Sequence, residues 1–310
     1  MARTRVPHDA LGTVGEALRA RLGREGYARV GGLHGGSAGF VLAHLARRET
    51  RLLVVVANAR AMDAVRLDLD ATLPAPCLPF PAWPRDTHEA GPPDPDVLSA
   101  RVAVLDRAAA LRRETDEAAA RSPSKAPFVV VAPIQALVQP VPSPDVLDAS
   151  SLVLRPAEEH PVGSLLEHLA LSGYARVGAV EAQGEFAARG GVVDVWPWGA
   201  EAPARIDLFG DEVESIRELD AATQRSGRDL ERLRLLALAA ERFRDPDPEG
   251  GVLLPDHLPA AAPIPRLEPE SIAEAAPRLG GSGPEALRRL DDALAARRGR
   301  ELGAQPLGAH

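Results

Sequence analysis

The sequence predicts an α/β protein in which a domain with a parallel sheet is combined with a small α+β domain. Between residues 28 and 56 a strand, a glycine-rich loop, a helix and a second strand follow one another, which is the layout of a mononucleotide-binding βαβ unit. Between residues 192 and 219 three short strand-like runs are separated by turn residues, which predicts an antiparallel meander.

The composition of the chain excludes several classes of function. The chain has 310 residues, enough for about two domains. Its net charge of −8 argues against a broad nucleic-acid surface but is compatible with a local basic patch. The single cysteine, Cys77, excludes an internal disulfide and most cysteine-based metal sites, and it fits a reducing cytoplasm. No apolar run reaches the length of about 18 residues that a membrane-spanning helix needs.

The first domain is expected over residues 1–145, where helices alternate with strands. The helical stretches carry apolar residues along one stripe, whereas the strands are short β-branched runs typical of a buried parallel sheet. A proline-rich stretch at 74–84 is unsuited to a helix or a central strand, and we expect it to run extended. The expected helices are 11–22, 40–48, 59–69 and 97–113, and the expected strands are 28–30, 52–56 and 128–132.

The glycine-rich loop is the candidate nucleotide site. A phosphate loop has the pattern GxxxxGK[ST], whose lysine reaches the β- and γ-phosphates. Depending on the register, that position is occupied by Ser37 or Ala38, and Lys125 is the only lysine in the chain. The stretch is interpreted as a degenerate phosphate loop without a cofactor, or as glycines kept for tight strand-to-helix packing. Its residues are Gly32, Gly35, Gly36, Ser37 and Ala38.

The second domain is expected over residues 146–226. Its helix is predicted to begin with Ser164 as N-cap, because Glu167 stands three residues further on, at the capping-box spacing. A strand over 174–180 is expected to lead into the meander. Beyond this domain, residues 227–299 are expected to return to the first domain as helices and loops. The tail at 300–310 lacks periodicity and is predicted to be disordered.

The middle strand of the meander carries the first functional signal. Arg205, Asp207 and Phe209 share one face of this strand, because side chains alternate between the two faces of a sheet. A cation, an anion and an aromatic ring on one face suit a protein–protein surface better than a core. The histidines show no metal-ligand spacing, so we assign no metal site, and the sequence offers no catalytic residues.

Four blocks of the second domain resemble the N-terminal region of the bacterial transcription-repair coupling factors, the Mfd family. That region is itself similar to the excision-repair protein UvrB. The blocks are GEFAARGG at 184–191, VDVWP at 193–197, RIDLF at 205–209 and DEVESIR at 211–217. The resemblance covers nearly all of residues 10–240. It implies a UvrB-like, degenerate P-loop NTPase-like first domain and an inserted α+β domain that binds UvrA. Ala38, where UvrB carries the phosphate-loop lysine, favours the coupling factors.

The resemblance also implies which residues meet UvrA. Arginines suit such a site, because guanidinium groups form bidentate bonds with carboxylates. Ala187 stands where UvrB has a further arginine, so the interface is weaker or rearranged here. The alternative for Arg189 is a surface arginine bonded to neighbouring backbone, whereas for Phe209 and Trp196 core packing is the favoured interpretation. The expected contact residues are Arg176, Phe186, Arg189, Arg205, Asp207 and Phe209.

The function that the resemblance implies is a non-catalytic adaptor. It would bind UvrA and recruit nucleotide excision repair to stalled RNA polymerase. In a longer relative, RNA polymerase and DNA would be bound by other domains, and the whole protein would be an ATP-dependent DNA translocase. We expect a cytoplasmic monomer without cofactor, metal or membrane segment. The alternatives are a UvrB-like ATP-dependent DNA helicase fragment and a DNA-binding module, whose binding would depend steeply on salt.

Overall fold

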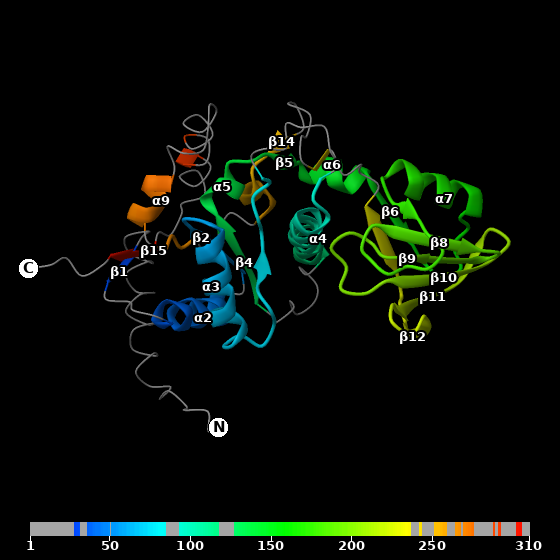
Figure 1. Cartoon of the computed structure of the whole chain (residues 1–310), viewed down its shortest axis with the longest axis horizontal. Coiled ribbons are helices and arrows are strands. Elements are labelled where there is room, and N and C mark those ends of the chain that lie inside the picture. The colour runs from blue at the N-terminus through cyan, green and yellow to red at the C-terminus, as the bar shows by residue number, and fades with distance from the viewer. Residues whose placement is uncertain are drawn as a thin grey trace, which may run out of the picture. The chain divides into compact units, whose positions relative to one another are not determined.

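The structure is a computed structural model of the chain (Figure 1). It forms two compact units, the first from residues 1–82, 110–139 and 253–310 and the second from 83–109 and 140–252. No helix in the described part of the chain is long and apolar enough to cross a membrane. The structure describes residues 28–31, 36–49, 51–84, 93–117, 127–236, 242–243, 251–258, 264–267, 269–275, 288, 291–292 and 302–305.

The first unit is built on a parallel sheet of strand order β2-β4-β3, as its buried β-branched runs predict. Strands β2 and β4 lie in register from Arg51 opposite Phe128 to Val56 opposite Pro133. The expected strand–helix–strand succession at 28–56 is confirmed as β1, α2 and β2. The elements are β1 Ala28–Gly31, α2 Ser37–Glu49, β2 Arg51–Val56, α3 Ala59–Asp70, β3 Leu78–Pro79, β4 Phe128–Pro133, α5 Ile134–Leu137, η1 Leu254–His257, α9 Pro269–Ala275 and β15 Leu302–Gln305.

The second unit contains a six-stranded sheet of order β12-β11-β10-β9-β8-β7. All neighbouring pairs are antiparallel except β7 and β8. The expected meander is confirmed as β9, β10 and β11. The elements are β5 Val141–Pro142, α6 Pro144–Ala149, β6 Ser151–Leu154, α7 Val162–Leu171, β7 Ala175–Arg176, β8 Glu185–Arg189, β9 Val192–Val195, β10 Ala204–Phe209, β11 Glu212–Asp220, β12 Arg225–Asp229, β13 Leu233–Leu236 and β14 Gly251–Val252; α4 Pro95–Glu117 contributes to both units.

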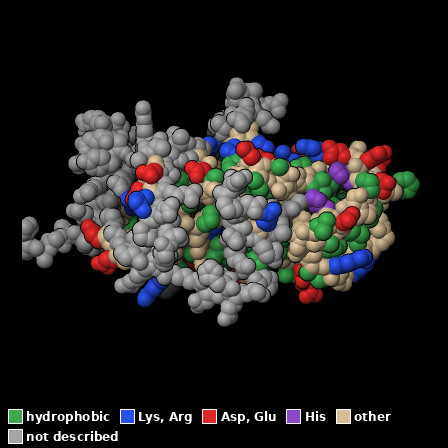
Figure 2. Space-filling model, turned by 90° about the horizontal axis from the view of Figure 1, so that it is seen from above, with side chains coloured by type: hydrophobic (Ala, Val, Ile, Leu, Met, Phe, Trp, Pro, Cys, Tyr) green, Lys and Arg blue, Asp and Glu red, His purple; other side chains and the backbone are tan. Residues whose placement is uncertain are grey.

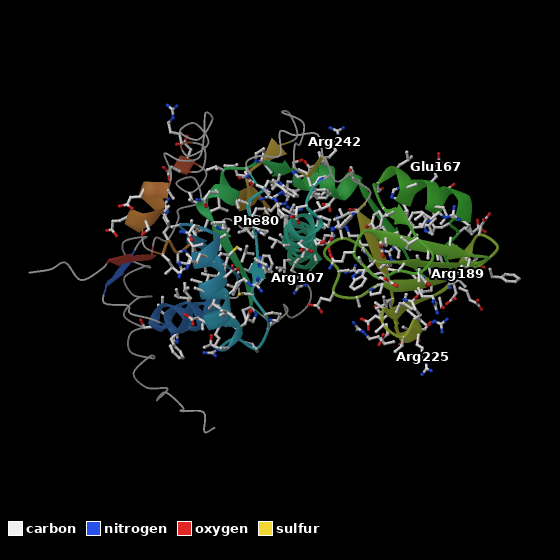
Figure 3. All side chains as sticks on the ribbon, in the orientation of Figure 1. Phe80, Arg107, Glu167, Arg189, Arg225 and Arg242 are labelled. Atoms are coloured by element: carbon white, nitrogen blue, oxygen red, sulfur yellow. The ribbon has the colours of Figure 1, made fainter. Side chains whose placement is uncertain are left out.

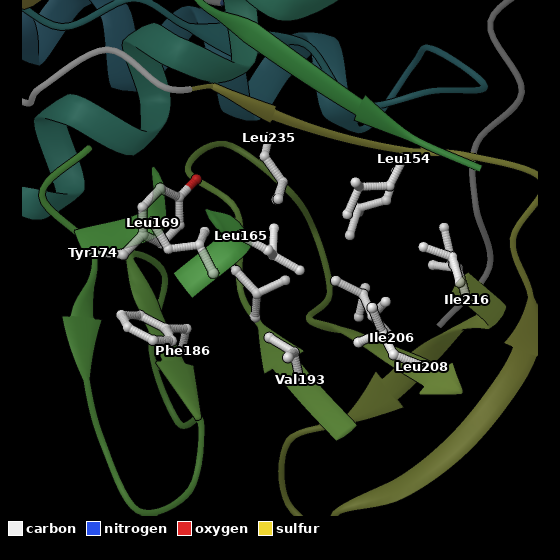
Figure 4. Close-up of a cluster of buried hydrophobic side chains, with 14 residues drawn as sticks. Leu154, Leu165, Leu169, Tyr174, Phe186, Val193, Ile206, Leu208, Ile216 and Leu235 are labelled. Atoms are coloured by element: carbon white, nitrogen blue, oxygen red, sulfur yellow. The ribbon is translucent and has the colours of Figure 1, made fainter. Parts of the chain in front are cut away.

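One face of this sheet carries the core of the second unit (Figure 4). Phe186, Val193 and Ile206 project from successive strands, and Leu165 of α7 and Leu154 of β6 pack against them. Along each strand these residues alternate with residues that face the other side, most of which are polar, so the opposite face of the sheet is largely polar. The core thus fixes which side chains are available for function.

Several expectations differ from the structure. Helix α7 begins at Val162 after Pro161, without a side-chain cap, so the Ser164 N-cap is wrong: Ser164 already lies inside the helix. The strand expected over 174–180 is limited to β7. The tail that was expected to be disordered contains β15, which pairs with β1. The helix expected over 11–22 lies outside the described residues.

The division into units also differs from the expected boundaries at 145 and 227. Residues 83–109 belong to the second unit. Strand β13 pairs with β6 and therefore also belongs there, although it follows residue 227. Pairing between segments far apart in sequence sets these boundaries, and local patterns carry no information about it.

Candidate functional site

The candidate site is the polar face of the second-unit sheet, formed by outward-facing residues of β8 to β11. Its rows follow from the register: Ala187 lies opposite Asp194, which lies opposite Arg205, which lies opposite Arg217. A second row runs through Arg189, Val192, Asp207 and Ser215. Acidic and basic side chains therefore meet across neighbouring strands, where opposite charges stabilise the sheet.

Arg205 and Asp194 form a bidentate ion pair in the middle of the polar face. Arg205 Nε donates to Oδ1 of Asp194 at 2.7 Å, and Nη2 donates to Oδ2 at 2.9 Å. Arg205 Nη1 also lies 3.4 Å from the carbonyl oxygen of Gln224 and from Oγ of Ser226. The hydrogen bond with Asp194 raises the pKa of Arg205. The charge of Arg205 is thus already paired within the domain.

Asp207 is held by its neighbours on β11. Oδ2 of Asp207 accepts from Ser215 Oγ at 2.9 Å and from Arg217 Nη2 at 2.5 Å. Burial alone would raise the pKa of Asp207, but the hydrogen bonds from Arg217 and Ser215 outweigh it and hold the pKa below its ordinary value. Asp207, like Asp194 on the neighbouring strand, is therefore a carboxylate whose charge is paired with an arginine of the same domain.

Arg189 and Phe209 lie at the end of the polar face where two hairpins turn. The β8–β9 turn begins at Gly190 and the β10–β11 turn at Gly210, with φ values of 61° and 64° that favour glycine. Arg189 is exposed and donates from Nη2 to the carbonyl oxygen of Gly178 (Figure 3). Phe209 is 82% exposed, so the favoured interpretation of core packing is wrong for this ring.

Arg176 and Phe186 do not belong to the polar face. Phe186 is 2% exposed and lies in the core cluster, so its ring is not available to a partner in the folded domain. Arg176 is exposed on the edge strand β7, where it is in register with Phe186. Of the expected contact residues, the structure therefore brings Arg189, Arg205, Asp207 and Phe209 onto one face and places Arg176 at the adjoining edge.

Sequence reasoning missed Asp194 and Arg217, the partners of Arg205 and Asp207. A signal was present for Asp194: it is the only polar residue in a β-branched run, and hairpin pairing sets it opposite Arg205. Arg217 forms its ion pair diagonally across the strands, and a bulge in the register between Asp207 and Leu208 shifts the pairing of β10 with β11. Sequence alone gives no access to that shift.

The glycine-rich loop of the first unit is described only in part, because Gly32 and Gly35 lie outside the described residues. Ser37 and Ala38 form the first turn of α2. A Cβ atom placed on Gly39 would lie 2.5 Å from Cβ of Asp68 on α3, so this glycine allows α2 and α3 to pack closely. A Cβ atom on Gly36 would lie 3.5 Å from Oδ1 of Asp68, which sets a carboxylate beside the start of α2.

The described residues support neither a metal site nor a reactive thiol. Among them, no group of at least three His, Cys, Asp or Glu side chains could hold a metal ion. Cys77 is buried, and burial together with a hydrogen bond involving Asp70 raises the pKa of its thiol to about 12. A thiol with so high a pKa is a poor nucleophile.

Comparison with known proteins relates part of the second unit to a known domain family. Residues 152–240 match the family model of the UvrB interaction domain. The transcription-repair-coupling factor of Mycobacterium tuberculosis (strain CDC 1551) is 31% identical over 207 residues, 67% of this chain and 16% of the relative. That of Escherichia coli (strain K12) is 26% identical over 209 residues, 67% of this chain and 17% of the relative.

A third relative matches a shorter stretch at higher identity. The transcription-repair-coupling factor of Bacillus subtilis (strain 168) is 38% identical over 98 residues, 32% of this chain and 8% of the relative. The chain spans about a sixth of the length of the first curated relatives that it matches. Residues 152–240 therefore form a UvrB interaction domain, carried by a chain that is similar to the transcription-repair-coupling factors over two thirds of its length.

Proposed function

We propose that this chain is a non-catalytic adaptor module that binds UvrA through the hairpin end of its polar face. The observation that carries the proposal is the exposure of Arg189 and Phe209 on a domain of the UvrB interaction family. Arg205 and Asp207 contribute by keeping this face rigid, because their charges are paired internally. Arg176 extends the docking surface at the sheet edge.

The chemistry of the exposed residues suits a protein partner. The guanidinium of Arg189 keeps N–H donors beyond the one that binds Gly178, and a carboxylate of the partner can accept them in a bidentate fashion. Phe209 lies two strands away and two residues further along β10, at about 12 Å by the usual strand spacing and rise, and supplies an apolar anchor. A cation beside an aromatic ring is the combination that interface centres favour.

The similarity to transcription-repair-coupling factors supports a proposal for the wider role. In a whole protein, this module would recruit nucleotide excision repair, while other domains would bind RNA polymerase and DNA and act as an ATP-dependent translocase. The module itself would work in the cytoplasm as a monomer.

Figure 2 shows cationic and anionic side chains interspersed over the visible described surface, an arrangement that fits protein docking better than binding to phosphates.

Nucleotide hydrolysis by this chain, the activity of a UvrB-like helicase fragment, is the second candidate. Against it stand the missing phosphate-loop lysine and the carboxylate of Asp68 beside Gly36, which would repel a triphosphate. We therefore propose that the loop is a degenerate phosphate loop. Titration with a labelled ATP analogue separates the two candidates: we expect no saturable binding, and micromolar affinity would favour the helicase.

Charge reversal at Arg189 tests the adaptor role. Arg189→Glu places an anion where the partner is expected to supply one, so retention of the chain by purified UvrA should fall more than about tenfold. Arg232→Glu, the same charge change at an exposed position before β13, is the matched control and should bind as the wild type does. Unchanged retention of Arg189→Glu, with the fold intact by circular dichroism, would remove Arg189 from the site.

A further inference from the structure

Residues 178–183, here called the strap, cover part of the polar face. Ala187 and Asp194 face outward from their strands, yet they are only 3% and 6% exposed. Val180 of the strap is also fully buried, but it does not belong to the core cluster, which lies on the opposite face of the sheet. Val180 is the one buried residue of the strap, and its carbonyl oxygen is bound by Gln224 from the far side of the sheet, which indicates that the strap runs over this face. The strap therefore covers the polar face near Ala187 and Asp194, whereas Arg189 and Phe209 at the hairpin end remain exposed.

The strap is fastened by side chains of the sheet. Arg189 donates to the carbonyl oxygen of Gly178. Oε2 of Glu185, which also faces outward from β8, accepts from the backbone nitrogens of Glu181 and Ala182 at 2.8 and 2.9 Å. These contacts come from β8 alone, next to the strap in sequence.

Gln224 supplies the long-range anchor. It lies in the turn between β11 and β12, at the far edge of the sheet from β7. Its Nε2 atom donates to the carbonyl oxygen of Val180 at 3.0 Å and to that of Ala221 at 2.8 Å. The carbonyl oxygen of Gln224 in turn lies 3.4 Å from Nη1 of Arg205. Gln224 thus joins the strap, its own turn and the central ion pair.

The backbone of Gln224 adopts a conformation that residues other than glycine rarely adopt. Its φ is 57°, in the left-handed region where glycine is favoured over other residues. Residues held in such conformations cluster at functional sites, because the surrounding contacts must outweigh the strain. In this turn the compensating contacts are the hydrogen bonds of the amide group, which glycine would not make.

We propose that Gln224 is a positioning residue for docking, an inference that rests on the proposed function. By anchoring Val180 it fixes the strap, and the Gly178 carbonyl of the fixed strap orients the Arg189 guanidinium toward the partner. Without the anchor, Arg189 would have to be ordered when the partner binds. That ordering lowers affinity, because a long side chain loses its rotamer freedom at that step.

Hydrogen exchange on the free chain tests the anchor. Gln224→Gly removes the amide group in a backbone conformation that glycine adopts readily, so the fold should be kept. The backbone amides of Glu181 and Ala182 should then exchange about three- to tenfold faster, as expected for the loss of one hydrogen bond that holds the strap. Ala222→Gly, in the same turn, is the matched control and should leave their exchange unchanged. Unchanged exchange in Gln224→Gly would show that Gln224 does not anchor the strap.

A double-mutant cycle with purified UvrA tests the positioning role. Gln224→Gly should weaken binding about three- to tenfold in the wild-type background and should have no further effect in Arg189→Ala. Independent effects in the double variant, unchanged affinity or tighter binding would overturn the proposal. If the wild-type chain did not bind UvrA, the proposed function would fail and the docking role of Gln224 with it. The exchange result would still decide whether the strap is anchored.

Discussion

The ion pair between Arg205 and Asp194 predicts unequal losses of stability when either partner is removed. The Arg205 side chain is 21% exposed and that of Asp194 is 8% exposed. Arg205 also has acceptors 3.4 Å away on the β11–β12 turn and on β12. Removal of Asp194 therefore leaves a cation that can still find acceptors and water. Removal of Arg205 leaves a nearly buried carboxylate, which is costlier.

The unfolding free energy lost on breaking this ion pair lies between two limits. Breaking a fully buried ion pair costs about 3–5 kcal/mol, whereas an exposed pair is worth about 0–1 kcal/mol. This pair lies nearer the buried limit, so we expect a loss of about 3 kcal/mol for Arg205→Met and about 2 kcal/mol for Asp194→Ala. The double variant removes both charges together, and it should lose only about 3 kcal/mol, which is a coupling of about 2 kcal/mol.

Urea unfolding of the wild type, the two single variants and the double variant measures these losses of stability, provided that the slope of unfolding free energy against urea concentration is the same in all four. The exposed pair of Arg228 and Glu218 on the same sheet is the control, and its cycle should show no measurable coupling. Equal losses in the two single variants of the Arg205 pair, or additive losses in the double variant, would show that the burial and pairing of these two charges do not set the cost of removing them.

Three further predictions concern the two units. Gly39→Ala should destabilise the chain by about 1–3 kcal/mol in thermal or urea unfolding, because its Cβ atom would clash with Asp68, whereas Gly36→Ala should cost less. Below pH 3.8, the usual pKa of an aspartate, the unfolding free energy of Asp207→Asn should fall less steeply with decreasing pH than that of the wild type. In the folded chain, hydrogen bonds outweigh burial and hold the pKa of Asp207 below this value. The stabilisation that the Asp207 carboxylate provides is therefore lost as pH falls through its folded pKa. Arg234→Met should cost about 2–3 kcal/mol in urea unfolding, because it removes ion pairs from a 13% exposed guanidinium to α4 and α6.

The sequence predicts the meander well because its signals are local. Turn residues at Gly190 and Gly210 and the alternation along β10 define the strands and their faces without knowledge of the rest of the chain. The same alternation separates Phe186 from Arg189 on β8, since residues three positions apart on a strand face opposite sides. That rule would have placed Phe186 in the core.

The strap could not be predicted in the same way. Residues 174–180 are β-branched and apolar enough to predict a strand, and Val180 is indeed buried. Its carbonyl oxygen, however, is bound by the side chain of Gln224, far away in the sequence. Likewise, the paired state of Arg205 and Asp207 depends on register and on a bulge. Contacts of this kind arise only when the sheet has formed.

Hydrogen exchange of the chain in the presence of purified UvrA tests the proposed docking surface most directly. If UvrA binds the hairpin end of the polar face, exchange should slow at Arg176, at Arg189 to Gly191 and around Phe209, and should stay unchanged in helix α7 on the opposite face of the sheet. Protection confined to α7 or to the first unit, with none at the hairpin end of the polar face, would contradict it.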